Sequence, residues 1–173
     1  MKTKKYIKKI KKLKKIKNET GQSMVELAVS LIVLLILLAG VVDVGRIAFY
    51  YIAMRDTAQE AASYASIFPN NNYEIIERAK AGTVDQSRIT VVLRFLDEGV
   101  LTYECESADL VCSSYLDSSP INQVDVGDSV QITVTDSAFP ITMPFIGIYL
   151  GRQSIQLETT VEDTVVRVPK IIP

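Results

Sequence analysis

A long apolar stretch near the N-terminus dominates the pattern of hydrophobic and polar positions. No charged residue occurs from Leu27 to Val42, and the wider window from Met24 to Gly45 gives a helix ~33 Å long at about 1.5 Å per residue. The hydrocarbon core of a bilayer is about 30 Å thick, so this window is long enough to cross it once. The pattern therefore predicts a membrane-spanning helix.

The helical pattern continues beyond the apolar stretch. No proline occurs from Ser23 to Ser66, and the first helix breaker is Pro69, which is followed by turn-forming asparagines. Small residues recur at spacings of three and four in the second half of this segment, at Ala58, Ala61, Ala62 and Ala65. Such a strip lets another element approach a helix closely. We therefore expect one extended N-terminal helix over residues 22–66, half of it outside the membrane.

The remainder of the chain, residues 67–173, has the pattern of a small mixed domain. Residues 73–81 are expected to form a short helix, with Asn72 as its N-cap and Gly82 at its end. Apolar and polar residues then alternate in segments typical of strands: 89–95, 100–105, 129–135 and 154–161. A short antiparallel sheet packed on the alanine strip is the simplest arrangement. The predicted fold class is α+β.

Charge separates a leader from the rest of the chain. Residues 1–21 hold ten lysines and one acid, which gives +9, whereas the other 152 residues hold nine Lys or Arg and nineteen acids, which gives −10. Lysines directly before an apolar span are typical of the cytoplasmic side, where anionic lipids attract them. We expect residues 1–21 to be a cytoplasmic leader that contacts anionic lipids, and residues 67–173 to lie outside the cell (inner) membrane, in a single-pass topology.

A secretory signal peptide and a nucleic-acid-binding tail are both less consistent with the N-terminal sequence. A signal peptide also begins with basic residues, but its apolar region is shorter and ends at a small-residue cleavage site. Here the span runs into "DVGRIAFYYIAMRD", without such a site. A lysine-rich tail can bind nucleic acid, but its position directly before a membrane span favours lipid. We therefore expect no nucleic-acid partner.

The composition argues against an enzyme. The chain contains no histidine, which excludes histidine-based catalytic triads and most catalytic zinc sites. Pairs of acids such as Glu104 with Glu106 and Asp125 with Asp128 fall at turns or strand ends and belong to no catalytic or calcium-binding motif. We expect no catalytic residues, metal, cofactor or small-molecule substrate.

The two cysteines, Cys105 and Cys112, are too few for a structural zinc site without histidine. Outside the membrane, where disulfides persist, a bond between them is the favoured interpretation. It would close a short loop and stabilise the fold by about 2–3 kcal/mol in the chain-entropy model. Two reduced, buried thiols are the alternative.

Glu26 is a charged residue directly before the uncharged stretch that is predicted to span the membrane. Glu26 lies at the edge of the apolar stretch, five residues after Gly21, in "GQSMVELA". A charged side chain costs about 3 kcal/mol at the bilayer centre by insertion scales, so such residues are usually functional. The N-terminal part of the chain resembles a TadE-like minor pilin, a type IV prepilin-like protein of tight-adherence (Flp-type) pili. The features that carry the resemblance are the basic leader, Gly21 and Glu26, the apolar run, "DVGR" at 43–46 and the stretch "RDTAQEAASYAS".

The resemblance implies specific roles for these residues. A membrane prepilin peptidase would cut between Gly21 and Gln22, where a small residue suits an enzyme that grips extended backbone beside a helix start. Glu26 would become the fifth residue of the mature protein and pair with the new amino terminus of a neighbouring subunit. Opposite charges attract strongly in a low dielectric, and each alone is costly there.

Asp43 and Arg46 are three residues apart, close enough to pair on one helix face. As a surface ion pair they would contribute less than about 1 kcal/mol. The resemblance implies a further role in subunit assembly, because an acid and an arginine at these places are common in the family.

The leading interpretation is a structural, non-enzymatic minor pilin or pseudopilin that is processed by a prepilin peptidase and takes part in assembly of an adhesive surface pilus. Its partners would be the peptidase and other pilin and pilus-assembly subunits. The alternative is a permanently anchored single-pass membrane protein whose extracytoplasmic domain binds a ligand or partner. The spacing of Gly21 and Glu26 favours the first, because a plain anchor needs no glutamate there.

Overall fold

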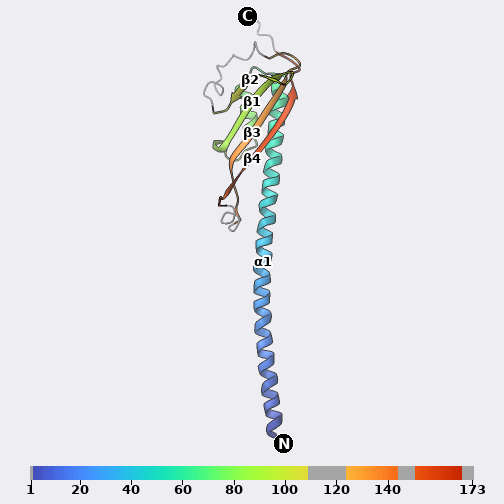
Figure 1. Cartoon of the computed structure of the whole chain (residues 1–173), viewed down its shortest axis with the longest axis vertical. Helices are drawn as coiled ribbons and strands as arrows, with labels where there is room; N and C mark the ends of the chain where they lie inside the picture. The colour runs from blue at the N-terminus through green and yellow to red at the C-terminus, as the bar shows by residue number, and fades with distance from the viewer. Residues whose placement is uncertain (1, 109–123, 144–150, 169–173) are drawn as a thin grey trace. The chain divides into compact units, whose positions relative to one another are not determined.

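A computed structural model describes residues 2–108, 124–143 and 151–168 of the chain, and the side chains from residue 21 onward (Figure 1). The elements in chain order are α1 (Lys2–Ala65), α2 (Asn72–Lys80), the 3-10 helix η1 (Gln86–Arg88), β1 (Ile89–Asp97), β2 (Val100–Glu106), β3 (Ser129–Pro140) and β4 (Ser154–Thr164). A long N-terminal helix followed by an antiparallel sheet confirms the α+β fold class. The chain divides into two compact units, Met1–Val44 and Gly45–Pro173.

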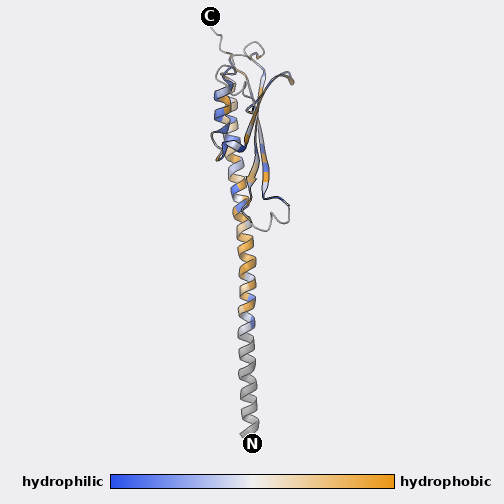
Figure 2. Cartoon of the chain, turned by 90° about the vertical axis from the view of Figure 1, so that its left-hand side faces the viewer, coloured by the Kyte–Doolittle hydropathy of each residue, from blue (hydrophilic) through white to orange (hydrophobic). Residues whose placement is uncertain are grey.

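The N-terminal unit is helical from Lys2, so α1 begins in the lysine-rich leader. Its apolar side chains are exposed: Met24 is 76 %, Leu31 53 % and Val44 67 % accessible. Figure 2 shows this stretch of α1 as a continuous hydrophobic segment. Within Gly21–Ala65, α1 is long and apolar enough to cross a membrane. Apolar surface of this extent on a helix is stable only in lipid or against other proteins.

The C-terminal unit contains a four-stranded sheet with the order β2-β1-β3-β4 and antiparallel neighbours throughout (Figure 1). Burial in β1 alternates strictly, so that Ile89, Val91, Leu93 and Phe95 face the core as predicted. The turn between β1 and β2 uses Glu98 and Gly99, both with positive φ. All four strands therefore begin at the residues that the period-2 pattern predicted, and each continues beyond its predicted end.

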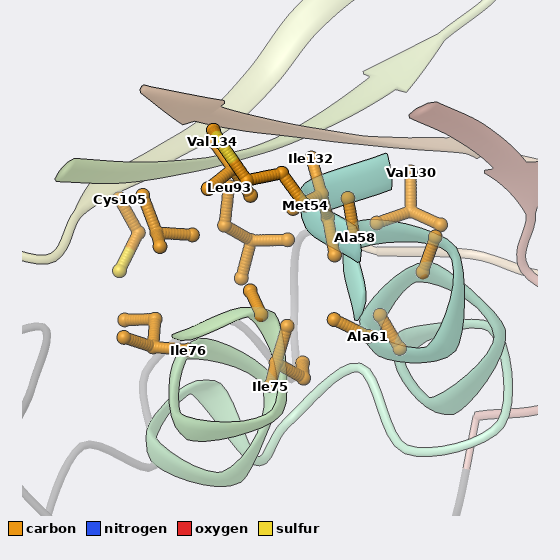
Figure 3. Packing of buried hydrophobic residues seen from close by; sticks show 14 of the residues in the cluster. Met54, Ala58, Ala61, Ile75, Ile76, Leu93, Cys105, Val130, Ile132 and Val134 are labelled. Atoms are coloured by element: carbon orange, nitrogen blue, oxygen red, sulfur yellow. The ribbon is translucent and has the colours of Figure 1, made fainter. Parts of the chain in front are cut away.

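The core lies between the inner face of the sheet and the two helices. The alanine strip predicted for α1 is fully buried, and Met54 of the same face is also 0 % exposed. Figure 3 shows Met54 and Ala58 of α1 close to the strands that carry Ile132 and Val130, and Ala61 on the side of α1 toward Ile75 of α2. Small side chains on the helix let it approach the larger side chains of the strands closely.

Helix and strand ends differ from the sequence-based expectation at several places. The N-cap of α2 is Asn71, whose side chain accepts a hydrogen bond from the Glu74 amide at 3.3 Å, so the helix begins one residue earlier than predicted. Strand β3 continues to Pro140 instead of ending at Thr135, because a β-bulge between Asp136 and Phe139 restores pairing with β4. Helix α1 ends at Ala65, one residue before the expected end.

Gly82 packs closely on α1. A Cβ atom at this position would lie 2.5 Å from Cγ2 of Thr57 and 3.2 Å from the carbonyl oxygen of Ala53. Because a backbone oxygen cannot move aside cheaply, only glycine fits here. The sequence pattern accounted for Gly82 as a helix end, whereas the structure adds close packing against α1 as a second reason.

Candidate functional site

The two residues predicted for processing and the assembly residue Glu26 lie within two turns of α1. Gly21, Gln22 and Glu26 are all exposed, beside the exposed apolar residues Val25 and Leu27. Nε2 of Gln22 donates a long hydrogen bond of 3.4 Å to Oε1 of Glu26, one helical turn away. This donor is neutral and brings no positive charge to the Glu26 carboxylate.

Gly21 is part of α1 and is not at the start of a helix. A Cβ atom there would meet nothing within 4 Å. Its small size is therefore not required by packing within this chain. Glycine lowers helix stability by about 1 kcal/mol relative to alanine, a cost that Gly21 shares with Gly40 and Gly45 of the same helix.

Asp43 and Arg46 occupy successive turns of α1 but have different surroundings. Asp43 is 6 % exposed, whereas Arg46 is exposed. The guanidinium of Arg46 donates a hydrogen bond to Oγ1 of Thr142 and lies 5.7 Å from the ring centroid of Phe139. Arg46 thus holds the end of β3 and the residues after it against α1, a role that spacing along the helix did not predict.

A buried polar cluster in the C-terminal unit was not predicted. Asp136 of β3 is 0 % exposed, and its Oδ2 accepts a hydrogen bond of 2.9 Å from the Tyr50 hydroxyl. Its Oδ1 accepts from the amide of Ala138 at 2.9 Å, and Arg88 approaches Oδ2 at 3.6 Å. The sequence contained a signal for the burial of Asp136, because this residue continues the alternating series of inward-facing residues Val130, Ile132 and Val134.

Other described carboxylates serve as local caps. Oδ2 of Asp128 accepts from the amide of Asp125 at 2.8 Å. The hydroxyl and amide of Ser87 donate to Asp85, which lowers the pKa of that carboxyl. In the part of the chain that the structure describes, no group of three or more His, Cys, Asp or Glu residues is placed to hold a metal ion.

Cys105 lies in β2 and is 2 % exposed, whereas Cys112 lies outside the described residues. The disulfide between them stays a prediction. We expect alkylation of the native protein without reductant to label neither thiol, and labelling of both after reduction and unfolding. A control that is unfolded but not reduced separates a bond from mere burial, because buried reduced thiols would then react. Labelling in that control would contradict the disulfide.

Comparison with known proteins gives one family match. Residues 21–63 match the model of the family described as TadE-like protein. No curated protein and no solved structure matches the chain. The match begins at Gly21 and ends within the alanine strip, so it covers the segment that carries Gln22, Glu26, Asp43 and Arg46. Residues 21–63 of α1 are therefore similar to the segment that characterises TadE-like proteins.

Proposed function

We propose that the chain is a minor pilin of a tight-adherence (Flp-type) pilus, with a structural and not a catalytic role. It is made as a single-pass precursor whose leader, residues 1–21, lies in the cytoplasm against anionic lipids. A prepilin peptidase removes the leader, after which residues 22–66 anchor the subunit and residues 67–173 form its extracytoplasmic domain. The family match over residues 21–63 supports a relation to the Tad pilus and to its other subunits.

The start of the family match at Gly21 is the observation that carries this proposal. The match excludes the lysine-rich leader and begins at the residue after which cleavage is expected. The helix-propensity cost of glycine supports access by a protease at this position, since a peptidase binds its substrate in an extended conformation. A Cβ atom at Gly21 would meet nothing within 4 Å, so packing of this chain does not require glycine there. This supports recognition by the peptidase as the reason for a small residue at the position.

Processing is tested by intact-mass and N-terminal analysis of the protein from cells with and without the peptidase. We expect the mature chain to lack residues 1–21 and to begin at Gln22, or its cyclised form, only when the peptidase is present. A bulky side chain at the cleavage position should block the enzyme, so Gly21→Leu should remain full length.

Gly45→Leu is the matched control, because a Cβ at Gly45 also meets nothing within 4 Å but lies at the far end of the span. It should be processed normally. A mature wild-type chain that still begins near Met1 would overturn the pilin proposal and favour a permanent membrane anchor with a partner-binding domain.

A further inference from the structure

Strand β4 forms a long edge of the sheet. It pairs with β3 on one side through an unbroken register from Ser129↔Thr164 to Asp136↔Leu157. Among the described residues, it has no neighbouring strand on its other side (Figure 1). The opposite edge, β2, is shorter, and its pairing with β1 is interrupted by a register shift. Of the two edges, β4 therefore offers the longer regular row of backbone groups.

The outward backbone groups of β4 belong to alternate residues. Both the N–H and the C=O of Val165 bond to the β3 side, at 2.8 Å to Asp128 and 2.9 Å from Gly127. Because this direction alternates along a strand, Gln156, Glu158, Thr160 and Glu162 direct their N–H and C=O groups away from β3. The amide of Thr164 agrees with this assignment, since it bonds to the Asp163 side chain instead of to β3.

The protection of this edge against strand addition is its negative charge. Native edge strands are commonly blunted by charged side chains, proline or a bulge, and β4 contains neither lysine nor proline between Ser154 and Thr164 but carries Glu158, Glu162 and Asp163. Its outward-directed residues are all exposed, including Glu158 and Glu162 on the same face. Two glutamates with an exposed threonine between them give the edge a negative face.

These charges disfavour pairing of β4 with a second copy of itself. In an antiparallel pair centred on Thr160, Glu158 of one chain would lie opposite Glu162 of the other. Like charges directly opposite each other are destabilising. The strand has three acids and no base, so pairing with a second copy supplies no cation to these acids in any register.

We infer that the β4 edge binds an extended strand of a different protein, with Lys or Arg residues four apart that face Glu158 and Glu162. Backbone hydrogen bonds to the edge would supply affinity, and the two ion pairs would supply selectivity, as in other cases of strand addition. This inference concerns the folded C-terminal unit and holds or fails independently of processing at Gly21.

A labelled peptide tests the inference with the full-length chain in detergent micelles. The peptide is about ten residues long, to match β4 at ~3.3 Å per residue, and alternates valine and threonine with two lysines four residues apart. A second peptide carries glutamate in place of lysine, and a third carries N-methyl groups on the amides that face β4. Fluorescence anisotropy should show binding of the lysine peptide alone.

Two variants locate the binding site. Glu158→Gln with Glu162→Gln should weaken binding of the lysine peptide about tenfold and remove most of its salt dependence. Glu77→Gln with Glu106→Gln removes the same charge from exposed acids on α2 and β2 and should leave binding unchanged. Thr160→Pro removes an outward amide, which an edge strand tolerates, and should abolish binding.

Failure of the lysine peptide to bind, equal binding of all three peptides, or equal loss in both double variants would each overturn the inference. Self-association of the wild-type chain that disappears in Thr160→Pro would also overturn it in favour of a second copy. If Thr160→Pro fails to fold, the N-methylated peptide gives the same test of backbone pairing with the wild-type protein.

Discussion

Cells that carry Glu26→Gln are expected to cut the precursor normally and yet to lose at least about tenfold of the subunit from the assembled fibre or complex. The structure leaves the Glu26 carboxylate on an exposed apolar helix, with the neutral side chain of Gln22 as its donor at 3.4 Å. A neutral amide costs less to bury than a carboxylate, so the variant should insert and accumulate as well as the wild type.

The expected loss has an electrostatic cause. Under the proposed processing, cleavage before Gln22 would create an amino group one helical turn from Glu26 within the chain, and the proposal is that this group pairs with Glu26 of a neighbouring subunit. In a low dielectric, a carboxylate with a cationic partner is stabilised, whereas a glutamine cannot replace that attraction. The measurement is recovery of the subunit in purified fibres or complexes, beside its processing pattern on a gel.

Glu19→Gln is the matched control for this prediction. It makes the same substitution in the leader, two residues before the expected cleavage position, so the mature protein would be unchanged. It should be processed and assembled normally. Normal assembly of Glu26→Gln would contradict a role in subunit contact, and failure of its cleavage would instead make Glu26 a recognition residue for the peptidase.

Replacement of Asp136 by alanine is expected to lower the free energy of unfolding of the C-terminal unit by about 3 kcal/mol. The carboxylate is fully buried and serves three groups: the Tyr50 hydroxyl, the Ala138 amide and the Arg88 guanidinium. Its removal leaves buried donors without an acceptor and opens a small cavity. The Ala138 amide lies in the bulge of β3, so the bulge also loses its internal hydrogen bond.

Denaturant unfolding of the full chain in micelles, followed by near-ultraviolet circular dichroism, measures this loss. Tyr50→Phe removes one donor and leaves the other two contacts of Asp136 intact, so we expect a cost of about 1 kcal/mol. Asp97→Ala, at the exposed end of β1, should change stability by less than about 0.5 kcal/mol. Equal effects of Asp136→Ala and Asp97→Ala would contradict a structural role for the buried cluster.

The sequence predicted those parts of the fold that depend on local periodicity. Alternation from Ile89 to Phe95 determined both the strand and its buried face, because each residue's direction follows from its neighbours. The spacing of Ala58, Ala61 and Ala62 likewise identified the buried face of α1 before any partner for it was known. When apolar or small residues recur this regularly, the pattern fits one secondary-structure type and one buried face.

Contacts between distant segments were beyond this reasoning. Tyr50 and Asp136 are 86 residues apart, and no local pattern indicates that one hydroxyl meets one carboxylate. The contact of Arg46 with Thr142 has the same character, since it joins α1 to the residues that follow β3. The extension of β3 to Pro140 was missed because a bulge breaks the period-2 pattern on which the prediction depended.

The buried face of α1 bears on how a soluble fragment of this protein can be made. Tyr50, Met54 and the four alanines lie in α1, and they belong to the same core as the strands. A chain shortened to begin at Gly45 keeps all six, whereas one that begins after Ser66 exposes the inner face of the sheet to water. A water-soluble fragment for crystallisation or antibody production should therefore retain about the last six turns of the helix.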